Sequence, residues 1–271
     1  MKTVRLLTCI IAFSLAITWI GNFPVYGAEM RVSSQRKSEG IIIVGVKSDS
    51  EKKIRIGVHA TDSDEEYFFT YNNDGEAGNA IDIPLIFGNG NYSIELYEEL
   101  KDKYYELCDS YDLVLRLADY ESVYLSSSLM VPWSGAEATV AKAGELTRRR
   151  NGDFEKFYAI YKFVTENIVY DITKTVESGY RSSPDATLED GSGICLDIAV
   201  LLAAMLRSAG VRCKLVYGSV KDVEGLHSWT EVYFRGKWVI IDPTRDSQYY
   251  VSRVPYRYAK SAGDYQSTYK F

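Results

Sequence analysis

Apolar and polar residues alternate with the period of a β-strand through much of the first half of the chain. Between residues 53 and 60, Ile54, Ile56 and Val58 fall on one side and Arg55 and His59 on the other, which predicts a strand with one buried face. The other segments of this kind are 40–47, 66–71, 80–87, 91–98, 104–107 and 113–117. Short strands separated by turn signals predict an all-β, sandwich-like module over residues 40–125, preceded by a polar segment at 29–39.

Turn residues separate several of these segments. The sequence Asn-Asn-Asp-Gly at 72–75 is typical of a turn, because these residue types tolerate or stabilise turn geometry. Gly-Asn-Gly at 88–90 lies between two predicted strands, so a hairpin is expected there. Three serines followed by Pro132 interrupt the pattern, and residues 126–134 are therefore expected to link the module to the rest of the chain.

Helical periodicity replaces the alternation after residue 135. Residues 137–148 have helical character, and the apolar residues of 153–167 recur at the spacing of an amphipathic helix. These apolar residues are Phe157, Ile160, Tyr161 and Val164. Residues 194–209 are almost uniformly apolar and predict a buried helix that ends at Gly210. The polar loop at 173–190 before it has the length of loops that tend to be functional.

The segments 227–234 and 237–244 predict a hairpin around Arg235-Gly236. With a two-residue loop, His227 and Asp242 share one face as a diagonal pair roughly 7–8 Å apart at Cα, within reach of a hydrogen bond. A loop of odd length would place the two side chains on opposite faces. Their proximity therefore depends on the length of this turn.

Charge and the N-terminal segment narrow the class of protein. The formal net charge of −6 disfavours nucleic acid and anionic membranes as partners. Lys2 and Arg5 precede an uncharged apolar run at 6–20, and small residues follow, which predicts a secretory signal peptide at 1–28. A retained N-terminal anchor is the alternative. We expect a secreted or otherwise extracytoplasmic protein, with the cell surface included, and no membrane span once the signal is removed.

Three cysteines lie outside the predicted signal: Cys108, Cys195 and Cys213. An exported protein stabilised by disulfides normally has an even and denser set, so at least one of these thiols is free. Cys195 falls in the first turn of the helix at 194–209, where free amides and the helix dipole favour a thiolate and can bind an oxyanion. Cys213 is interpreted as a core residue of a strand and Cys108 as a small core residue.

A cysteine, a histidine and an aspartate are the residue types that thiol-based acyl transfer requires. His227 is the available base, because His59 lies on the polar side of its strand and is interpreted as exposed. Asp242 on the paired strand would hold the imidazole tautomer and stabilise its cation. A serine hydrolase using Ser192 is a weaker interpretation, since Asp-Gly-Ser-Gly lacks the nucleophile-elbow pattern.

Three sequence blocks resemble the transglutaminase-like superfamily: G-I-C at 193–195, H-S-W-T-E-V-Y at 227–233 and G-K-W-V-I-I-D-P-T at 236–244, with Tyr170-Asp171 before them. The resemblance covers residues 155–245. It implies an α+β fold in which a papain-like catalytic domain at 135–271, with a helix-borne cysteine packed on an antiparallel sheet, follows the β module.

The same resemblance implies a triad of Cys195 as nucleophile, His227 as base and acid, and Asp242 as the orienting residue. Tyr170 is a candidate oxyanion donor, with core packing as the alternative, and Trp229 is a candidate wall of the substrate site. The calcium-site pattern of the animal cross-linking enzymes is absent from the sequence, and we expect neither a metal nor a cofactor.

Together these features predict an exported thiol enzyme that acts on peptide-type amides through an acyl-cysteine intermediate. The acyl group would pass to water, as in a peptidase or amidase, or to an amine, as in a transglutaminase. Location alone suggests a polypeptide or cell-envelope peptide as substrate, and the oligomeric state is left open. The alternative is a non-catalytic binding or assembly module that keeps the transglutaminase-like fold.

Overall fold

A computed structural model describes residues 28–48, 52–71, 80–101, 104–177 and 179–271. The signal peptide predicted at 1–28 lies outside these residues except for Ala28, and the turn predicted at 72–75 lies outside them too. Within the described residues, no helix combines the length and the apolar character needed to cross a bilayer.

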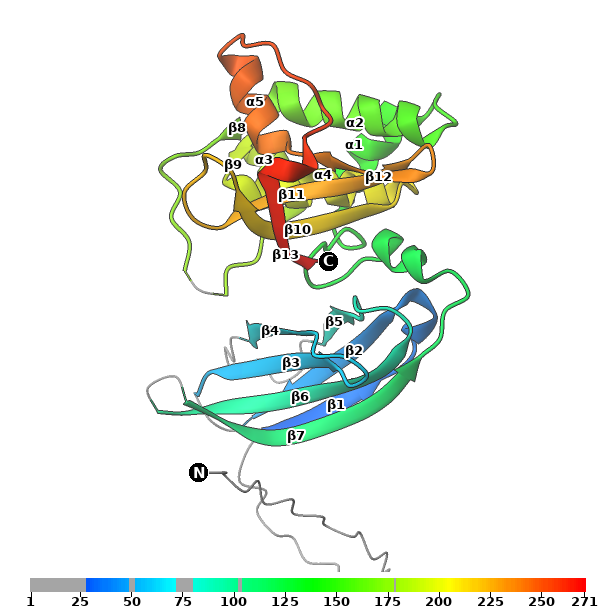
Figure 1. The fold of residues 1–271 in the computed structure, drawn as a ribbon, viewed down its shortest axis with the longest axis vertical. Coiled ribbons are helices and arrows are strands. Elements are labelled where there is room, and N and C mark those ends of the chain that lie inside the picture. Colours follow the sequence, from blue (N-terminus) through cyan, green and yellow to red (C-terminus); the bar gives the residue numbers. More distant parts are fainter. Residues whose placement is uncertain (1–27, 49–51, 72–79, 102–103, 178) are drawn as a thin grey trace, which may run out of the picture.

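The N-terminal region contains two antiparallel sheets (Figure 1). The first has the order β1-β2-β5, and its strands are β1 (Glu29–Ser33), β2 (Ile41–Lys47) and β5 (Ile81–Pro84). The second has the order β4-β3-β6-β7, and its strands are β3 (Ile54–Ala60), β4 (Glu66–Tyr71), β6 (Gly90–Lys101) and β7 (Tyr104–Leu115). Alternate apolar residues of both sheets, among them Val44, Ile56 and Ile94, are fully buried in one core. The alternation in the sequence is therefore explained by a shared apolar interior.

The strand pairing corrects two expectations in this region. The hairpin predicted around 88–90 is wrong, because β5 pairs with β2 in one sheet while β6 pairs with β3 and β7 in the other. The hydroxyl of Tyr92 accepts a hydrogen bond from the Phe87 amide (2.9 Å) and donates one to the Gly88 carbonyl (2.7 Å). These two bonds fix residues 85–90 as a connection that crosses from one sheet to the other. The polar segment expected at 29–39 begins with strand β1, because Met30 and Val32 pack on the core.

Strand β7 also replaces the two short strands expected at 104–107 and 113–117. Cys108 lies in the middle of this strand and is partly exposed, so its interpretation as a core residue is wrong. Most of the residues around Cys108 in β7 face solvent, and the buried residues of this strand, Leu113 and Leu115, lie near its end.

The C-terminal region is mixed helix and strand, as the sequence predicts. Its sheet has the order β12-β11-β10-β13, built from β10 (Cys213–Val220), β11 (His227–Phe234), β12 (Lys237–Ile241) and β13 (Tyr265–Lys270). Its helices are α1 (Glu137–Thr147), α2 (Asp153–Asn167), α3 (Pro184–Asp190), α4 (Cys195–Ser208) and α5 (Pro243–Val251). Two short strands, β8 (Val169–Tyr170) and β9 (Ser192–Gly193), pair in parallel. The chain as a whole is thus α+β, with antiparallel main sheets.

Helix α4 is the buried centre of this region. Every residue from Ile198 to Leu206 is at most 1% exposed. The helix contacts the strands β10 and β11 as well as α1, α2 and α3. A surface this apolar on all sides of a helix is stable only where neighbours cover every face. The N-terminus of α4, and with it Cys195, is consequently held by the whole domain.

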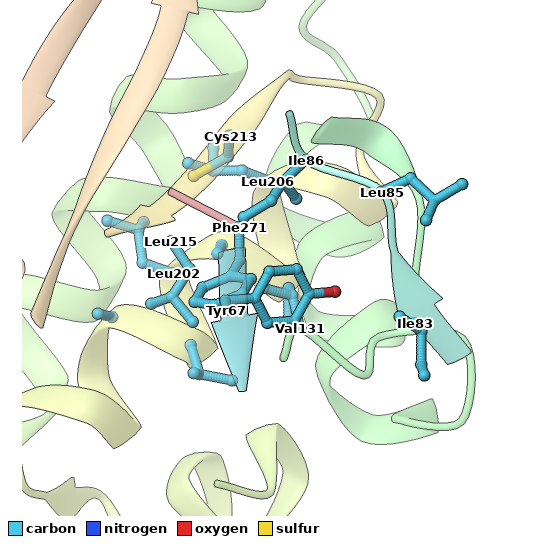
Figure 2. Close-up of a cluster of buried hydrophobic side chains, with 14 of the residues drawn as sticks. Tyr67, Ile83, Leu85, Ile86, Val131, Leu202, Leu206, Cys213, Leu215 and Phe271 are labelled. Atoms are coloured by element: carbon cyan, nitrogen blue, oxygen red, sulfur yellow. The ribbon is translucent and has the colours of Figure 1, made fainter. Parts of the chain in front are cut away.

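The two regions share one hydrophobic core. Figure 2 shows Tyr67 of β4 beside Phe271 and Leu202, with Val131 of the connecting segment nearby. The rings of Tyr67 and Phe271 meet edge to face with centroids 5.1 Å apart. The segment 126–134, expected as a linker, is packed here, since Ser127, Ser128 and Val131 are at most 3% exposed. The arrangement favours a fixed geometry between the two regions.

Arg207 joins three distant segments at this junction. Its buried guanidinium donates to the carbonyls of Ser126, Cys213 and Phe271, each at 2.8 Å. Burial lowers the pKa of Arg207 to about 10, which leaves it charged at neutral pH.

We expect Arg207→Met to lower the free energy of unfolding by about 3 kcal/mol, because three buried carbonyls lose their donor at roughly 1 kcal/mol or more each. Urea denaturation monitored by tryptophan fluorescence measures this change. Arg149→Met, at an exposed position, is the matched control and should change stability by less than about 0.5 kcal/mol. Equal stabilities of the two variants would contradict the role assigned to Arg207.

Candidate active site

Cys195 is the first residue of helix α4. Ile194, just before it, is extended, and its amide donates to the Asp197 carboxylate at 3.0 Å, which caps the helix. Gly193 lies against the same carboxylate, and a β-carbon at position 193 would come within 2.5 Å of the Asp197 side chain. The G-I-C block is therefore a tight entry into the helix that fixes where the thiol emerges.

A buried polar cluster holds the loop before α4 against this helix start. Asp197 is fully buried and accepts hydrogen bonds from Lys174 Nζ (2.7 Å) and the Tyr180 hydroxyl (2.8 Å). Lys174 Nζ also donates to the Tyr180 oxygen at 2.8 Å. Burial opposes ionisation of Asp197, but its bonds to Lys174 and its other donors prevail and hold the pKa below the usual range. The long polar loop noted in the sequence is thus tied to the helix that carries Cys195.

His227 and Asp242 meet as the turn length requires. The ladder of β11 and β12 pairs Phe234 with Lys237 and Thr230 with Ile241, so the two-residue turn at Arg235-Gly236 is confirmed. His227 Nε2 lies 2.9 Å from Asp242 Oδ2. The strand expected to run to Thr244 ends at Ile241, because Asp242 caps helix α5 by accepting the Arg245 amide at 3.0 Å and Pro243 begins that helix.

Tyr265 is a further partner of Asp242 that the sequence reasoning missed. Its hydroxyl donates to Asp242 Oδ2 at 2.9 Å from strand β13. Tyr265 is one of several tyrosines between residues 249 and 269, and no local pattern in the sequence distinguishes it from the others. Asp242 is fully buried and receives three donors, so its position and orientation are closely defined.

Trp229, the candidate wall of the substrate site, is buried against the imidazole of His227. It is 1% exposed, its ring is parallel to the imidazole at a centroid distance of 6.4 Å, and it meets Tyr265 edge to face at 5.1 Å. Trp229 therefore packs against the imidazole and Tyr265 and supports both rings. Gly218, opposite His227 in the ladder, permits this packing, since a β-carbon there would lie 2.7 Å from the Trp229 ring.

The Cys195 thiol contacts the imidazole of His227. Burial disfavours the Cys195 thiolate, but the hydrogen bond and charge of His227 and the amides of Ser228 and Leu196 outweigh it and lower the thiol pKa. Burial likewise opposes the imidazolium, yet the bonds to Asp242 and Cys195 raise the pKa of His227 to about 9. Because Nε2 faces Asp242, Nδ1 is the nitrogen left to face the thiol. The arrangement favours a thiolate–imidazolium pair at neutral pH.

Two tyrosines lie close enough to Cys195 for the charge of its thiolate to affect their pKa values. Burial and then the thiolate charge raise the pKa of Tyr170 and that of Tyr217. Tyr170 belongs to the short parallel ladder in which it pairs with Gly193, two residues before Cys195. The pairing with Gly193 places Tyr170 near the start of α4, and the raised pKa keeps its hydroxyl protonated, the state in which it can donate a hydrogen bond.

The remaining cysteines and the second histidine lie elsewhere. Cys213 is fully buried in β10, as the sequence predicts, and burial raises its thiol pKa to about 12. His59 lies on β3 between Glu66 (3.0 Å) and Glu95 (3.1 Å), where it is partly buried and not freely exposed. Among the described residues, no group of three or more His, Cys, Asp or Glu side chains is arranged to hold a metal ion.

We expect iodoacetamide at pH 6 to alkylate Cys195 at least about tenfold faster than Cys213 or Cys108. The lowered pKa of the Cys195 thiol raises its thiolate fraction at this pH, and the thiolate is the form that iodoacetamide alkylates. Peptide mapping by mass spectrometry measures the three rates in one sample. As pH rises, alkylation of Cys195 should level off at a lower pH than alkylation of an ordinary thiol does. Equal rates at Cys195 and Cys108 would contradict an activated thiolate.

Comparison with known proteins adds a family context. Residues 140–243 match the sequence model of the transglutaminase-like superfamily. Human kyphoscoliosis peptidase is 28% identical over 141 residues, which are 48% of this chain and 21% of the relative. The mouse protein is 30% identical over 146 residues, 50% of this chain and 21% of the relative. The chain thus spans about a fifth of the length of the curated relatives it matches.

Among solved structures, a proposed cysteine protease from Cytophaga hutchinsonii has 15% identity and a TM-score of 0.45, with 82% of each chain covered. The periplasmic domain of TgpA from Pseudomonas aeruginosa has 16% identity and a TM-score of 0.39, with 88% of this chain and 77% of that chain covered.

Proposed function

Since residues 140–243 form a transglutaminase-like domain, we propose that this protein is a thiol enzyme that cleaves or transfers peptide-type amides through an acyl-Cys195 intermediate. One observation carries the proposal. A cysteine at a helix N-terminus contacts an imidazole whose other nitrogen is fixed by a buried carboxylate at 2.9 Å. Thiol acyl transfer needs these three groups in this order of contact.

Acylation follows from the charge state of the pair. The Cys195 thiolate attacks the carbonyl carbon of the substrate amide, forming a C–S bond and a tetrahedral oxyanion. The free amides at the start of α4 and the Tyr170 hydroxyl supply donors for that oxyanion. As the intermediate collapses, the C–N bond breaks and the His227 imidazolium gives its proton from Nδ1 to the leaving amine.

Deacylation reverses the proton transfer. Neutral His227 takes a proton from the acceptor, which attacks the thioester carbon and expels the Cys195 thiolate. Water yields a carboxylic acid, and a primary amine yields a new amide. Water is the default acceptor, because an amine is favoured only where a shaped site excludes water. Peptidase or amidase action is therefore the preferred form of the proposal.

The proposal extends to location. An extracytoplasmic enzyme acting on a secreted or cell-envelope polypeptide agrees with the signal-like sequence at 1–28. Expression of the full chain in a bacterial host, followed by N-terminal sequencing of exported material, tests this part independently of activity. A protein that stays in the cytoplasm with residues 1–28 attached would contradict it.

The activity is tested by incubating the wild type and Cys195→Ala with a mixed protein substrate, with and without a labelled primary amine. New peptide termini with the wild type alone indicate hydrolysis, and incorporation of the amine indicates transfer. The alternative, a non-catalytic binding module, predicts neither product from either protein. Far-UV circular dichroism of both proteins controls for folding.

A further inference from the structure

A cavity of about 250 Å³ lies where the N-terminal sheet meets the C-terminal region. Its walls come from parts of the chain that are far apart in sequence: Phe69 of β4, Met130 of the connecting segment, Tyr180 of the polar loop, Leu196 and Val200 of α4, and Tyr217 of β10. Phe68 and Leu129 extend the apolar and aromatic part of these walls, while Thr70, Arg181 and Ser182 supply polar groups. The cavity therefore exists only because the two regions pack together.

The cavity is next to the thiol. Leu196 follows Cys195 directly, and Val200 lies one helical turn further along the same face of α4. Tyr217 lines the cavity and lies close enough to Cys195 for the thiolate charge to raise its pKa. In the ladder, Tyr217 pairs with Ser228, whose amide contacts the Cys195 thiol. The cavity therefore begins beside the nucleophile, within reach of a side chain of a peptide bound at Cys195.

The loop wall of the cavity is firmly positioned. Tyr180 is hydrogen-bonded to Asp197 and Lys174, so the segment 179–182 is tied to the start of α4. Met130 and Phe69 are partly buried and pack against the common core. An unbranched methionine adapts its shape to the group it contacts. The site is thus largely pre-formed, with one adaptable wall.

The volume indicates the kind of ligand. Pockets for drug-sized molecules are roughly 300–1,000 Å³, so a cavity of about 250 Å³ suits a single large side chain better than a separate small molecule. The aromatic and apolar part of the wall favours an aromatic side chain, which buries a large area there, and the polar groups of Thr70, Arg181 and Ser182 lie around it.

We propose that this cavity is a specificity subsite that takes an apolar, preferably aromatic, side chain of the peptide substrate close to the amide attacked by Cys195, with the strand-rich region forming one wall. The inference rests on the proposed function, because the side chain assigned to the cavity belongs to the peptide that Cys195 attacks. It assigns the N-terminal region a direct part in substrate selection.

The test uses the full chain and a fluorogenic peptide library in which one position at a time is varied. We expect the wild type to prefer aromatic over alanine at one position near the cleaved bond by at least tenfold in kcat/KM. Met130→Trp, which narrows the cavity, should remove that preference by lowering kcat/KM for the aromatic peptide to the level of the alanine peptide measured with the same variant. Met30→Trp is the matched control, because Met30 is also partly buried against the core but lies on β1, away from the cavity.

The outcomes separate the two proposals. Turnover with an aromatic preference that Met130→Trp abolishes and Met30→Trp retains supports the subsite. Turnover with an unchanged profile in Met130→Trp, or no aromatic preference in the wild type, overturns the subsite and leaves the proposed function intact. No turnover of any peptide by a wild type whose Cys195 is alkylated rapidly overturns the proposed function and the subsite with it.

Discussion

Asp242→Asn is expected to lower kcat/KM for peptide cleavage by about 10³–10⁴-fold, a size of effect typical of removing the orienting carboxylate of a triad. Asp242 Oδ2 accepts from His227 Nε2, and asparagine takes the negative charge away from that bond. The imidazolium is then less favoured, so the pKa of His227 falls from about 9. The alkaline limb of the activity profile should move to lower pH in the variant.

The design of this variant separates chemistry from folding. Asparagine is as good an N-cap as aspartate, so helix α5 keeps its start. Tyr265→Phe, which removes only the second donor to the same oxygen, should reduce kcat/KM far less, by about tenfold. Asp242→Asn with more than a tenth of wild-type activity and an unmoved alkaline limb would show that Asp242 does not orient the base.

Asp197→Ala is expected to reduce both stability and activity. The fully buried carboxylate accepts hydrogen bonds from Lys174, Tyr180 and the Ile194 amide, and alanine removes this acceptor from all three donors. We expect the free energy of unfolding at pH 7 to fall by about 3 kcal/mol. Because the helix start and the loop 179–182 are displaced, kcat/KM should fall by about 10²-fold.

The pH dependence of stability identifies the origin of this effect. The pKa of Asp197 is lower in the folded protein than in the unfolded chain. The ionised carboxylate therefore contributes its full stabilisation of the fold at a pH above the unfolded-state pKa, and this stabilisation is lost as the pH falls through the folded-state pKa. The stability difference between wild type and Asp197→Ala should therefore shrink in acid. Asp190→Ala, at an exposed position at the end of α3, is the control and should match the wild type at every pH. A constant difference from neutral pH into acid would contradict an ionised Asp197.

Local patterns predicted most of the secondary structure, and they failed where pairing is decided at long range. The buried helix at Cys195 and the hairpin at Arg235-Gly236 follow from apolar periodicity and a two-residue turn. The crossover at Leu85–Gly90 looks like a hairpin in sequence because its glycines are turn residues in both cases. What decides between them is the bonding of Tyr92 to Phe87 and Gly88 and the choice of partner strands. Neither is a local property of the sequence.

The proposed triad was recognisable in the sequence because each member sits at a helix or strand boundary with its own local signal. Its supporting groups were not recognisable in this way. Tyr265 comes from the last strand, and Lys174 comes from a loop without regular structure. Neither residue lies at a distance along the sequence from Cys195 that would indicate a place in the same site. Trp229 is the opposite case. It is conspicuous in the sequence near His227, and in the structure it is buried against the imidazole.

The most direct test of the central claim is the detection of an acyl group on Cys195. The wild type is mixed with an activated peptide ester, quenched in acid within the first turnover and analysed by intact mass and peptide mapping. We predict a mass increase equal to the acyl part of the substrate, located on Cys195, released by hydroxylamine and absent from Cys195→Ala. Substrate turnover without an adduct at Cys195, or an equal adduct on Cys108, would contradict the account.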